Sequence, residues 1–427
     1  MTAPVPRILV VDDSKMFVQV LVGNLKESID AEVVSAGSMG EACELLRRHA
    51  FDLALLDLNL PDAPQGEVVD LVLERGVPVI VFAGDCADQT RERLWSKRIV
   101  DYVVKEGAES LTYAVRQARR VIMNRDAKAL VVEDSETVRT MLAGLLRVHC
   151  FEVFEAGNGR EAMTVLNANP GIQLIITDFE MPEMDGLRFV RLVRARHPKD
   201  ELAIIGISSH EQENLSARFL KSGANDFLTK PFSSEEFYCR VSQNMDLLEY
   251  IRTIKDYSEK DFLTGLYNRR YLFSQGAGRA RRKQAAGGAV YLAMLDIDHF
   301  KKINDRYGHE KGDAVLKDMG ERLRQRFASL GIAVRLGGEE FCLLLDAVDG
   351  DVVEIVEGFR REVSSTPVTA GGSRIAFTVS VGLCGSANKD IESMIRRADE
   401  LLYEAKEQGR DRLVACLEEF SDGGPHV

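Results

Sequence analysis

Short apolar runs rich in β-branched residues alternate with amphipathic helical patterns over about the first 240 residues of the chain. One such run lies at residues 8–11 (ILVV) and another at residues 77–83 (VPVIVFA). This alternation is typical of a parallel sheet with crossover helices, and ligands in that architecture bind beyond the carboxyl ends of the strands. The pattern therefore predicts an α/β fold whose candidate chemistry lies where strands end.

The same pattern occurs twice. Residues 7–14 (RILVVDDS) recur 121 residues later as residues 128–135 (KALVVEDS). Asp57 and Asp178, which each close an apolar run, are also 121 residues apart. Self-similarity over this length indicates a whole domain, so we predict two copies of one α/β domain in series.

A long amphipathic helix is predicted over residues 234–258. Its first half is expected to pack on the second copy of the repeated domain, but from residue 247 onward no domain remains to cover it. A partner helix from a second protomer would cover this part as a short coiled coil. The apolar positions occur at steps of three or four and are Phe237, Val241, Met245, Leu248, Ile251 and Ile254.

The length of 427 residues exceeds what one hydrophobic core supports and suits about three domains. We place the two repeated domains at residues 1–125 and 126–248, a helical linker at residues 249–259 and a third domain at residues 260–427. These boundaries follow the ends of the repeat and of the apolar helix.

Composition and charge narrow the class of protein. The chain is 45% hydrophobic and 29% charged with a net charge of −12, and it shows no basic patch, which argues against nucleic-acid binding. Its apolar runs are far shorter than the roughly 20 residues of a membrane-spanning helix, and no secretory signal precedes the first strand. We therefore expect a cytoplasmic protein. Seven cysteines without CxxC spacing are expected to be reduced and mostly buried.

Acidic residues gather at the strand ends of the first copy. Asp12 and Asp13 follow the first strand, Asp57 ends the third, and Lys105 follows the fifth. Three adjacent carboxylates stay ionised only with a cation, and a hard ion such as Mg²⁺ (or Mn²⁺) suits oxygen ligands. One carboxylate could then attack a phosphoryl group and form an acyl phosphate, with the lysine balancing the charge. Acidic residues that merely cap the following helices are the alternative.

Both copies resemble the receiver domains of two-component response regulators, which are flavodoxin-like doubly wound domains. The resemblance implies phosphorylation on aspartate by a cognate histidine kinase or phosphotransfer protein. In the first copy it implies Asp12, Asp13 and Asp57 as metal ligands, Asp57 as phospho-acceptor and Lys105 as the switch lysine. In the second copy it implies the metal ligands Glu133, Asp134, Asp178 and Glu180, the phospho-acceptor Asp178, and the switch residues Ser208, Phe227 and Lys230.

The two copies differ in completeness. The second carries every part of the receiver pattern, and we expect it to be competent in signalling. In the first copy Ala83 stands where the family has Ser or Thr, and Glu106 replaces the proline that follows the lysine. Alanine cannot donate a hydrogen bond to a phosphoryl group, so phosphate and shape should be weakly coupled there. An adaptor or dimer-surface role is the competing assignment for the first copy.

The third domain carries an ordered series of motifs. Residues 261–270 (DFLTGLYNRR), 300–305 (FKKIND) and 335–341 (RLGGEEF) are followed by Lys406 and Arg410. In this order the motifs resemble the GGDEF family of diguanylate cyclases, in the GGEEF spelling, whose domain is α/β and nucleotidyl-cyclase-like. The resemblance implies that the protein condenses two GTP molecules into cyclic di-GMP. Each GTP is then held by one domain, so turnover requires a homodimer.

The chemistry of these residues agrees with that resemblance. The apolar run at residues 289–295 ends in Asp296, and two apolar runs flank Gly337, Gly338, Glu339 and Glu340 as a β-hairpin. Two carboxylates beside a triphosphate make a Mg²⁺ site. By resemblance, Asp296, the backbone of Ile297 and Glu339 hold the metal, and Asp296, Glu339 and Glu340 are catalytic. The implied GTP-binding residues are His299, Phe300, Lys301, Asn304, Asp313, Lys406 and Arg410.

One departure from the family concerns regulation. Many members carry an Arg-x-x-Asp product-binding site, and Ala328 and Gly331 occupy its two positions here. Neither side chain can bind guanine or phosphate, so we expect little feedback inhibition through that site. Three functions stay open at this point: an active cyclase under receiver control, a catalytically inactive effector that binds GTP or cyclic di-GMP, and a receiver pair that serves as a phosphate sink.

Overall fold

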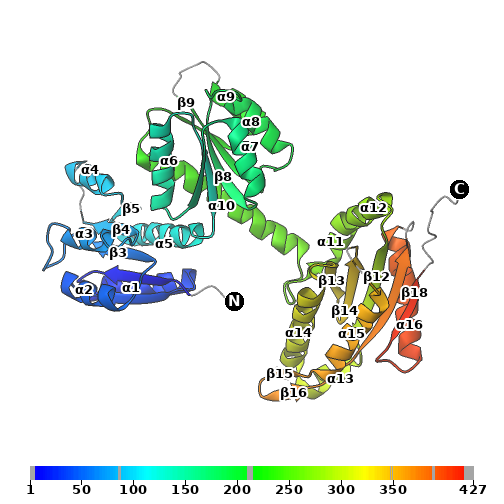
Figure 1. Ribbon diagram of the computed structural model, residues 1–427. Helices are drawn as coiled ribbons and strands as arrows, with labels where there is room; N and C mark the ends of the chain where they lie inside the picture. Colours follow the sequence, from blue (N-terminus) through cyan, green and yellow to red (C-terminus); the bar gives the residue numbers. More distant parts are fainter. Residues whose placement is uncertain are drawn as a thin grey trace. The chain divides into compact units, whose positions relative to one another are not determined.

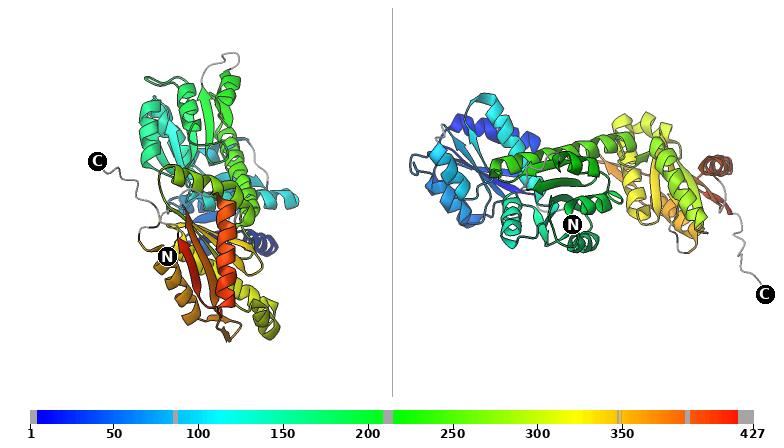
Figure 2. Two further views of the ribbon diagram at one scale, coloured as in Figure 1. Left: turned by 90° about the vertical axis from the view of Figure 1, so that its right-hand side faces the viewer. Right: turned by 90° about the horizontal axis from the view of Figure 1, so that it is seen from above.

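The computed structural model describes residues 5–84, 88–208, 215–346, 348, 350–386 and 390–417. The chain forms two compact units, Met1–Ile251 and Arg252–Val427. Figures 1 and 2 show two helix-flanked sheets in the first unit and one in the second. In the described residues, no helix is both long and apolar enough to cross a membrane.

The first sheet is parallel, with the strand order β2-β1-β3-β4-β5. One core cluster lies between this sheet and helices α1 and α5, and a second lies under α2, α3 and α4. The elements are β1 (Arg7–Val11), α1 (Lys15–Ser28), β2 (Glu32–Ala36), α2 (Met39–Arg48), β3 (Leu53–Asp57), α3 (Glu67–Leu73), β4 (Val79–Ala83), α4 (Asp88–Ser96), β5 (Asp101–Val104) and α5 (Gly107–Asn124).

The second sheet repeats this topology, with the strand order β10-β9-β8-β6-β7. Both of its faces are again covered by helices, which confirms the predicted pair of doubly wound domains. The elements are β6 (Lys128–Val132), α6 (Glu136–Val148), β7 (Glu152–Ala156), α7 (Gly159–Ala168), β8 (Ile172–Asp178), α8 (Gly186–Arg194), β9 (Ala203–Ser208), α9 (Leu215–Ser222), β10 (Asp226–Thr229) and α10 (Ser234–Glu259).

Helix α10 is continuous over 26 residues and has two apolar faces. Of the predicted stripe, Phe237, Val241, Met245 and Leu248 are buried in the core of the second domain, as expected. Ile254 was predicted to continue this stripe, but its side chain lies on a second, exposed stripe. That stripe is exposed by 50, 61, 67 and 80% at Leu247, Tyr250, Ile254 and Tyr257, respectively. At about 100° per residue, the second stripe lies on the opposite side of the helix from the first.

The C-terminal unit contains a six-stranded sheet with the order β11-β13-β14-β12-β17-β18, in which β12 is central and antiparallel to both of its neighbours. Its strands are β11 (Tyr267–Asn268), β12 (Val290–Ile297), β13 (Gly331–Gly337), β14 (Glu340–Leu345), β17 (Val379–Ser386) and β18 (Leu413–Leu417). A separate two-stranded sheet pairs β15 (Val368–Ala370) with β16 (Ser373–Ile375). The helices are α11 (Arg269–Tyr271), η1 (Leu272–Gly276), α12 (Ala277–Ala285), α13 (Phe300–Tyr307), α14 (His309–Phe327), α15 (Val352–Ser365) and α16 (Ile391–Glu407).

The cysteines are less buried than we expected. Cys342 and Cys384 are buried, Cys239 is exposed, and the other described cysteines are partly exposed. Cys86 lies outside the described residues. Among the described cysteines there is no disulfide bond. Their reduced state stays a prediction.

Candidate functional site

Three carboxylates meet at the carboxyl edge of the first sheet. Oxygens of Asp12, Asp13 and Asp57 all lie within 4.8 Å of one another. Lys105 Nζ is 2.7 Å from Asp12 Oδ2 and 2.7 Å from Asp57 Oδ2. Burial raises the pKa of Asp12, against the opposing effect of its hydrogen bond with Lys105. Oxygen ligands that are partly buried and incompletely neutralised fit a hard divalent cation, so the residues present suit Mg²⁺.

The second sheet carries the matching arrangement. Lys230 Nζ is 2.7 Å from Glu133 Oε2 and 2.8 Å from Asp178 Oδ1, and both acids are buried whereas Asp134 is exposed. Glu180 meets this cluster through its backbone N–H, which donates to Asp178 Oδ2 at 2.8 Å, while its side chain is exposed. Within the described ranges, three ligand oxygens come within 4.8 Å of one another only in the first domain.

Strand register identifies the switch position in each domain. Asp57 pairs with Phe82, and Asp178 pairs with Ile207, so the next residues, Ala83 and Ser208, are equivalent. Both are buried at the end of a strand, beside the sheet edge that carries Asp57 or Asp178. Only Ser208 offers a hydroxyl there. One of the two predicted differences between the domains is therefore a single side chain at one shared position, and the other is Glu106 in place of Pro231 after the lysine.

The aromatic residues of the switch have different surroundings. Phe227 packs against Phe219 inside its own domain, with a centroid distance of 5.5 Å. Tyr102, at the corresponding position of the first domain, packs edge-on against Trp95 at 6.3 Å. Trp95 in turn stacks on Tyr238 of α10 at 5.8 Å. Tyr102 of the first domain is thus connected through Trp95 to α10, the last helix of the second domain.

The C-terminal sheet places its acids on adjacent strands. Asp296 of β12 lies directly opposite Glu340 of β14, and the N–H of Ile297 donates to the carbonyl oxygen of Glu339 at 3.3 Å. Gly337 ends β13 and Gly338 begins the turn, with φ of 151° and 52°, in a region that favours glycine. The predicted hairpin is therefore present, and it brings Glu339 and Glu340 to the end of the strand that carries Asp296.

Lys406 of α16 extends to these acidic residues. Lys406 Nζ is 2.8 Å from Asp296 Oδ2. Burial raises the pKa of Asp296, and the nearby charges of Glu339 and Glu340 raise it further, while Lys406 opposes the rise. Carboxylates whose mutual repulsion is only partly relieved by one ammonium fit a divalent cation. Asp296, the Ile297 backbone and Glu339 are the residues that would hold it.

Of the other residues predicted to bind GTP, Arg410 is exposed between α16 and β18, and the rest lie on or beside α13 and α14. Lys301 and Asp313 are exposed, and Asn304 lies against Gly312, where a Cβ atom would clash with its side-chain oxygen. His299 is exposed at the start of α13 with φ of 58°. Phe300 differs from expectation because its side chain is buried in the core. Only its backbone is therefore available to a substrate.

Comparison with known proteins identifies both kinds of domain. The model of the response regulator receiver domain matches residues 8–116 and 129–242, which together cover more than half of the chain. The model of the diguanylate cyclase GGDEF domain matches residues 258–412. A solved structure of a two-component response regulator/GGDEF domain protein is 41% identical, with a TM-score of 0.54, and the match covers 57% of this chain and 99% of that one.

The chain belongs to the response regulators that carry receiver domains and a GGDEF diguanylate cyclase domain. Response regulator PleD of Caulobacter vibrioides is 28% identical over 451 aligned residues, which cover 96% of this chain and 98% of PleD. Diguanylate cyclase DgcP of Pseudomonas aeruginosa is 38% identical over 177 residues, or 40% of this chain and 26% of DgcP. The predicted family, fold class and enzyme class are thereby confirmed.

The product-binding motif missing from the response regulator is also excluded sterically. Gly331 begins β13, and a Cβ atom at this position would overlap the carbonyl oxygen of Leu344 on β14. An aspartate therefore cannot be accommodated there without moving the strand pair.

One arginine that supports the hairpin had no predicted role. Arg335 Nη1 is 2.9 Å from Asp261 Oδ1, and its Nη2 donates to the carbonyl oxygen of Gly338 at 2.8 Å. Asp261 follows α10 by two residues. Both residues stand in motifs that we quoted for the resemblance, but only the structure shows that they contact each other across 74 residues of sequence.

Proposed function

We propose that this response regulator is a phosphorylation-controlled diguanylate cyclase that converts two GTP molecules into cyclic di-GMP and two pyrophosphates. The observation that carries the proposal is that Asp296 lies directly opposite Glu340 on the adjacent strand, next to Glu339 in the hairpin, with Lys406 against Asp296. Inactive effectors need no such cluster, and product binding at the Arg-x-x-Asp position is sterically excluded.

The reaction joins each 3′-hydroxyl to the α-phosphorus of the other GTP. A P–O bond forms, the bond to the β-phosphate breaks, and pyrophosphate leaves. Glu339 is placed to accept the hydroxyl proton, while Lys301, Lys406 and Arg410 offset phosphate charge. Mg²⁺ or Mn²⁺, when bound by the acids, supplies charge neutralisation at the α-phosphate. Asn304 and Asp313 would bind guanine, because a carboxylate matches its two adjacent N–H donors.

The second stripe of α10 supports the homodimer that this reaction needs. Leu247, Tyr250, Ile254 and Tyr257 follow one another at steps of three, four and three, which are the a and d spacings of a coiled coil. Their exposure leaves an apolar seam that a second copy of the same helix would bury. Ile254→Asp should therefore yield monomers without cyclase activity, whereas Asp256→Ala, off the stripe, should leave dimers.

Control is assigned to the second receiver. A phosphoryl group transferred to Asp178 would be met by Lys230 and by the hydroxyl of Ser208, whereas the first receiver offers only Ala83 at that position. The test is turnover of GTP with Mg²⁺, with and without beryllofluoride, followed as cyclic di-GMP and pyrophosphate. We expect stimulation in the wild type and in Asp57→Asn, and its loss in Asp178→Asn. The reverse pattern would exchange the roles of the receivers, and absence of cyclic di-GMP from the wild type would refute the proposed function.

A further inference from the structure

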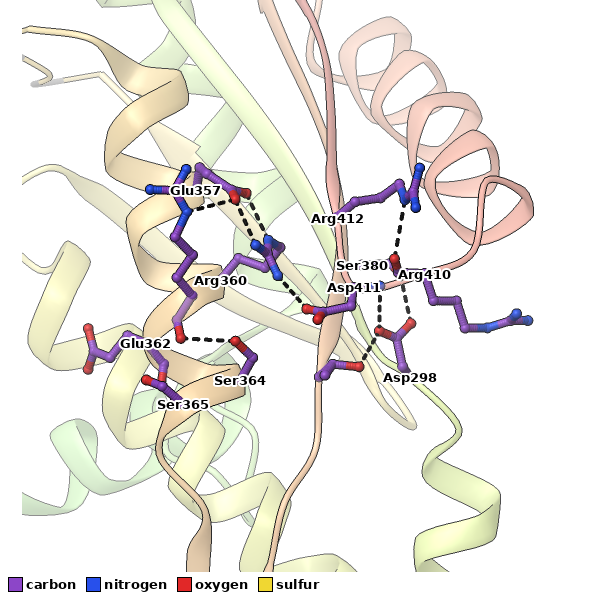
Figure 3. A network of polar contacts seen from close by, with 12 residues as sticks. Asp298, Glu357, Arg360, Glu362, Ser364, Ser365, Ser380, Arg410, Asp411 and Arg412 are labelled. Carbon is purple, nitrogen blue, oxygen red and sulfur yellow. Dashed lines mark hydrogen bonds and ion pairs between the residues drawn. The ribbon is translucent and has the colours of Figure 1, made fainter.

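Asp298 is a buried carboxylate two residues beyond Asp296. Its Oδ1 accepts a hydrogen bond from Ser380 Oγ at 2.7 Å. Its Oδ2 accepts one from Thr378 Oγ1 at 2.7 Å and one from the N–H of Asp411 at 3.0 Å (Figure 3). These partners in the described part of the chain are neutral donors, and together they use both oxygens of the carboxylate.

The third of these hydrogen bonds reaches a turn with unfavourable backbone geometry. Arg410 and Asp411 have φ of 63° and 46°, a left-handed conformation that residues with a Cβ atom rarely adopt. Such a conformation persists only where the surroundings enforce it. The hydrogen bond from the Asp411 N–H to Asp298 is one such constraint.

A second constraint acts on the side chain of Asp411. Arg360 of α15 forms an ion pair with this carboxylate, and Arg360 Nη2 also donates to Glu357 Oε1 at 2.7 Å (Figure 3). The turn is therefore held at its backbone by Asp298 and at its side chain by Arg360. The side chain of Arg410 itself points away from Asp298 (Figure 3).

The position of Asp298 in the chain makes this arrangement relevant to the substrate. It immediately precedes His299, which begins α13 with Lys301 and Asn304, and it follows the strand that carries Asp296. One carboxylate thus ties the start of α13 to the turn that presents Arg410, and both elements carry residues proposed to bind GTP.

We propose that Asp298 is a positioning residue, which holds the Arg410–Asp411 turn so that the Arg410 guanidinium meets the phosphates of GTP. This inference rests on the proposed function, because it takes Arg410 to be a phosphate-binding residue. A purely structural role would instead lower the stability of the fold and leave the affinity of correctly folded molecules for nucleotide unchanged.

The test is a double-mutant cycle that combines Asp298→Asn with Arg410→Ala. The readouts are binding of a non-hydrolysable GTP analogue, KM and kcat for GTP, and the melting temperature. Asp298→Asn should weaken analogue binding and raise KM about tenfold, with kcat changed much less, because a misplaced side chain loses its ground-state contact with the substrate. In the Arg410→Ala background, Asp298→Asn should cause no further change. Ser380→Ala, which leaves the Asp411 hydrogen bond in place, should change KM less than about twofold.

Unchanged analogue binding by folded Asp298→Asn would overturn the inference, as would an equal loss in both backgrounds. If Asp298→Asn does not fold, Arg360→Gln replaces it in the same cycle. That variant removes the ion pair with the Asp411 side chain and should also raise KM only while Arg410 is present. An unchanged KM in Arg360→Gln would likewise overturn the inference. A wild type that binds the analogue but makes no cyclic di-GMP would refute the proposed function without affecting this inference.

Discussion

Lys406 Nζ lies 2.8 Å from Asp296 Oδ2, so that α16 brings a positive charge to the carboxyl end of the central strand of the cyclase domain. The same relationship occurs in both receivers, where Lys105 and Lys230 each bridge two buried carboxylates. At all three sites an ammonium group offsets part of the negative charge that a divalent cation would otherwise have to offset alone.

Replacing Lys406 should change the pH dependence of the enzyme. Asp296 must be ionised to hold a cation, and burial already raises its pKa, so activity should fall as the pH falls through that pKa. Lys406→Met removes an opposing influence and should move the acid limb of kcat/KM to higher pH, with a loss of about ten- to a hundredfold at neutral pH. Lys317→Met, an exposed lysine on α14, is the control. An unshifted acid limb in Lys406→Met would argue against this role of the ion pair.

Arg335 should be irreplaceable by lysine. Its planar guanidinium contacts Asp261 and the carbonyl oxygen of Gly338 simultaneously, a fork that an ammonium cannot reproduce. We expect Arg335→Lys to lower kcat by about tenfold or more through disorder of the hairpin turn, with little loss of melting temperature. Arg397→Gln, in an exposed ion pair on α16, should retain wild-type activity. Equal rates in both variants would show that the hairpin needs no such support.

The serine–alanine difference between the receivers can be exchanged. Ser208→Ala should retain acceptance of phosphate at Asp178 but lose stimulation of the cyclase, because no hydroxyl then meets the phosphoryl group. Ala83→Ser restores that hydroxyl in the first receiver and should add a response that depends on Asp57. Phosphorylation stoichiometry and cyclic di-GMP formation, measured on the same samples, separate acceptance from coupling. Full stimulation of Ser208→Ala would refute this assignment.

Rebuilding the product-binding motif should destabilise the protein instead of making it inhibitable. A Cβ atom at residue 331 meets the backbone of β14, so Ala328→Arg combined with Gly331→Asp should lower the free energy of unfolding by about 2 kcal/mol or more. Ala328→Arg alone, at an end of α14, should be tolerated. Thermal melting and titration with cyclic di-GMP test both points, and a stable double variant that binds the product tightly would contradict the steric argument.

Asp101 should make the stability of the N-terminal unit depend on pH. Burial raises its pKa to about 6, and the hydrogen bonds from Tyr113 and from its neighbour's backbone only partly oppose this, while Glu235 adds to it. The folded state therefore binds the proton more tightly than the unfolded state, and stability should fall as the pH rises from about 4 to about 6. Asp101→Asn should stabilise the unit above that range by up to about 3 kcal/mol, with little effect near pH 4. Parallel pH curves for the two proteins would contradict the assignment.

The acidic clusters could be predicted because each depends on local sequence. In the two receivers, an acid at the end of a strand lies at the carboxyl edge of a parallel sheet, where the neighbouring strands also end. In the cyclase domain, Glu339 and Glu340 lie at a hairpin beside the end of the antiparallel strand that carries Asp296. The hairpin was predictable for the same reason, since its two glycines and flanking apolar runs are contiguous. The roles assigned to individual residues at these sites stay predictions, which the variants above test.

Contacts between distant residues could not be predicted. The partners of Asp298 lie 80, 82 and 113 residues away, and no local pattern relates them. The apolar stripe of α10 was incompletely predicted because steps of three and four residues connect the buried residues to Ile254 as well. The exposed face in fact begins at Leu247, one residue before the buried Leu248. A shift of one residue on a helix is a rotation of about 100°, so a small ambiguity in pattern becomes a different surface.

Helix α10 thus presents two different faces: one packs against the second receiver, and the other is exposed along the seam. Because both faces belong to one continuous helix, a rotation of α10 about its own axis against the second receiver would turn the seam through the same angle. Under the proposed control by the second receiver, phosphorylation would then set the angle of the seam, and not merely whether two copies meet.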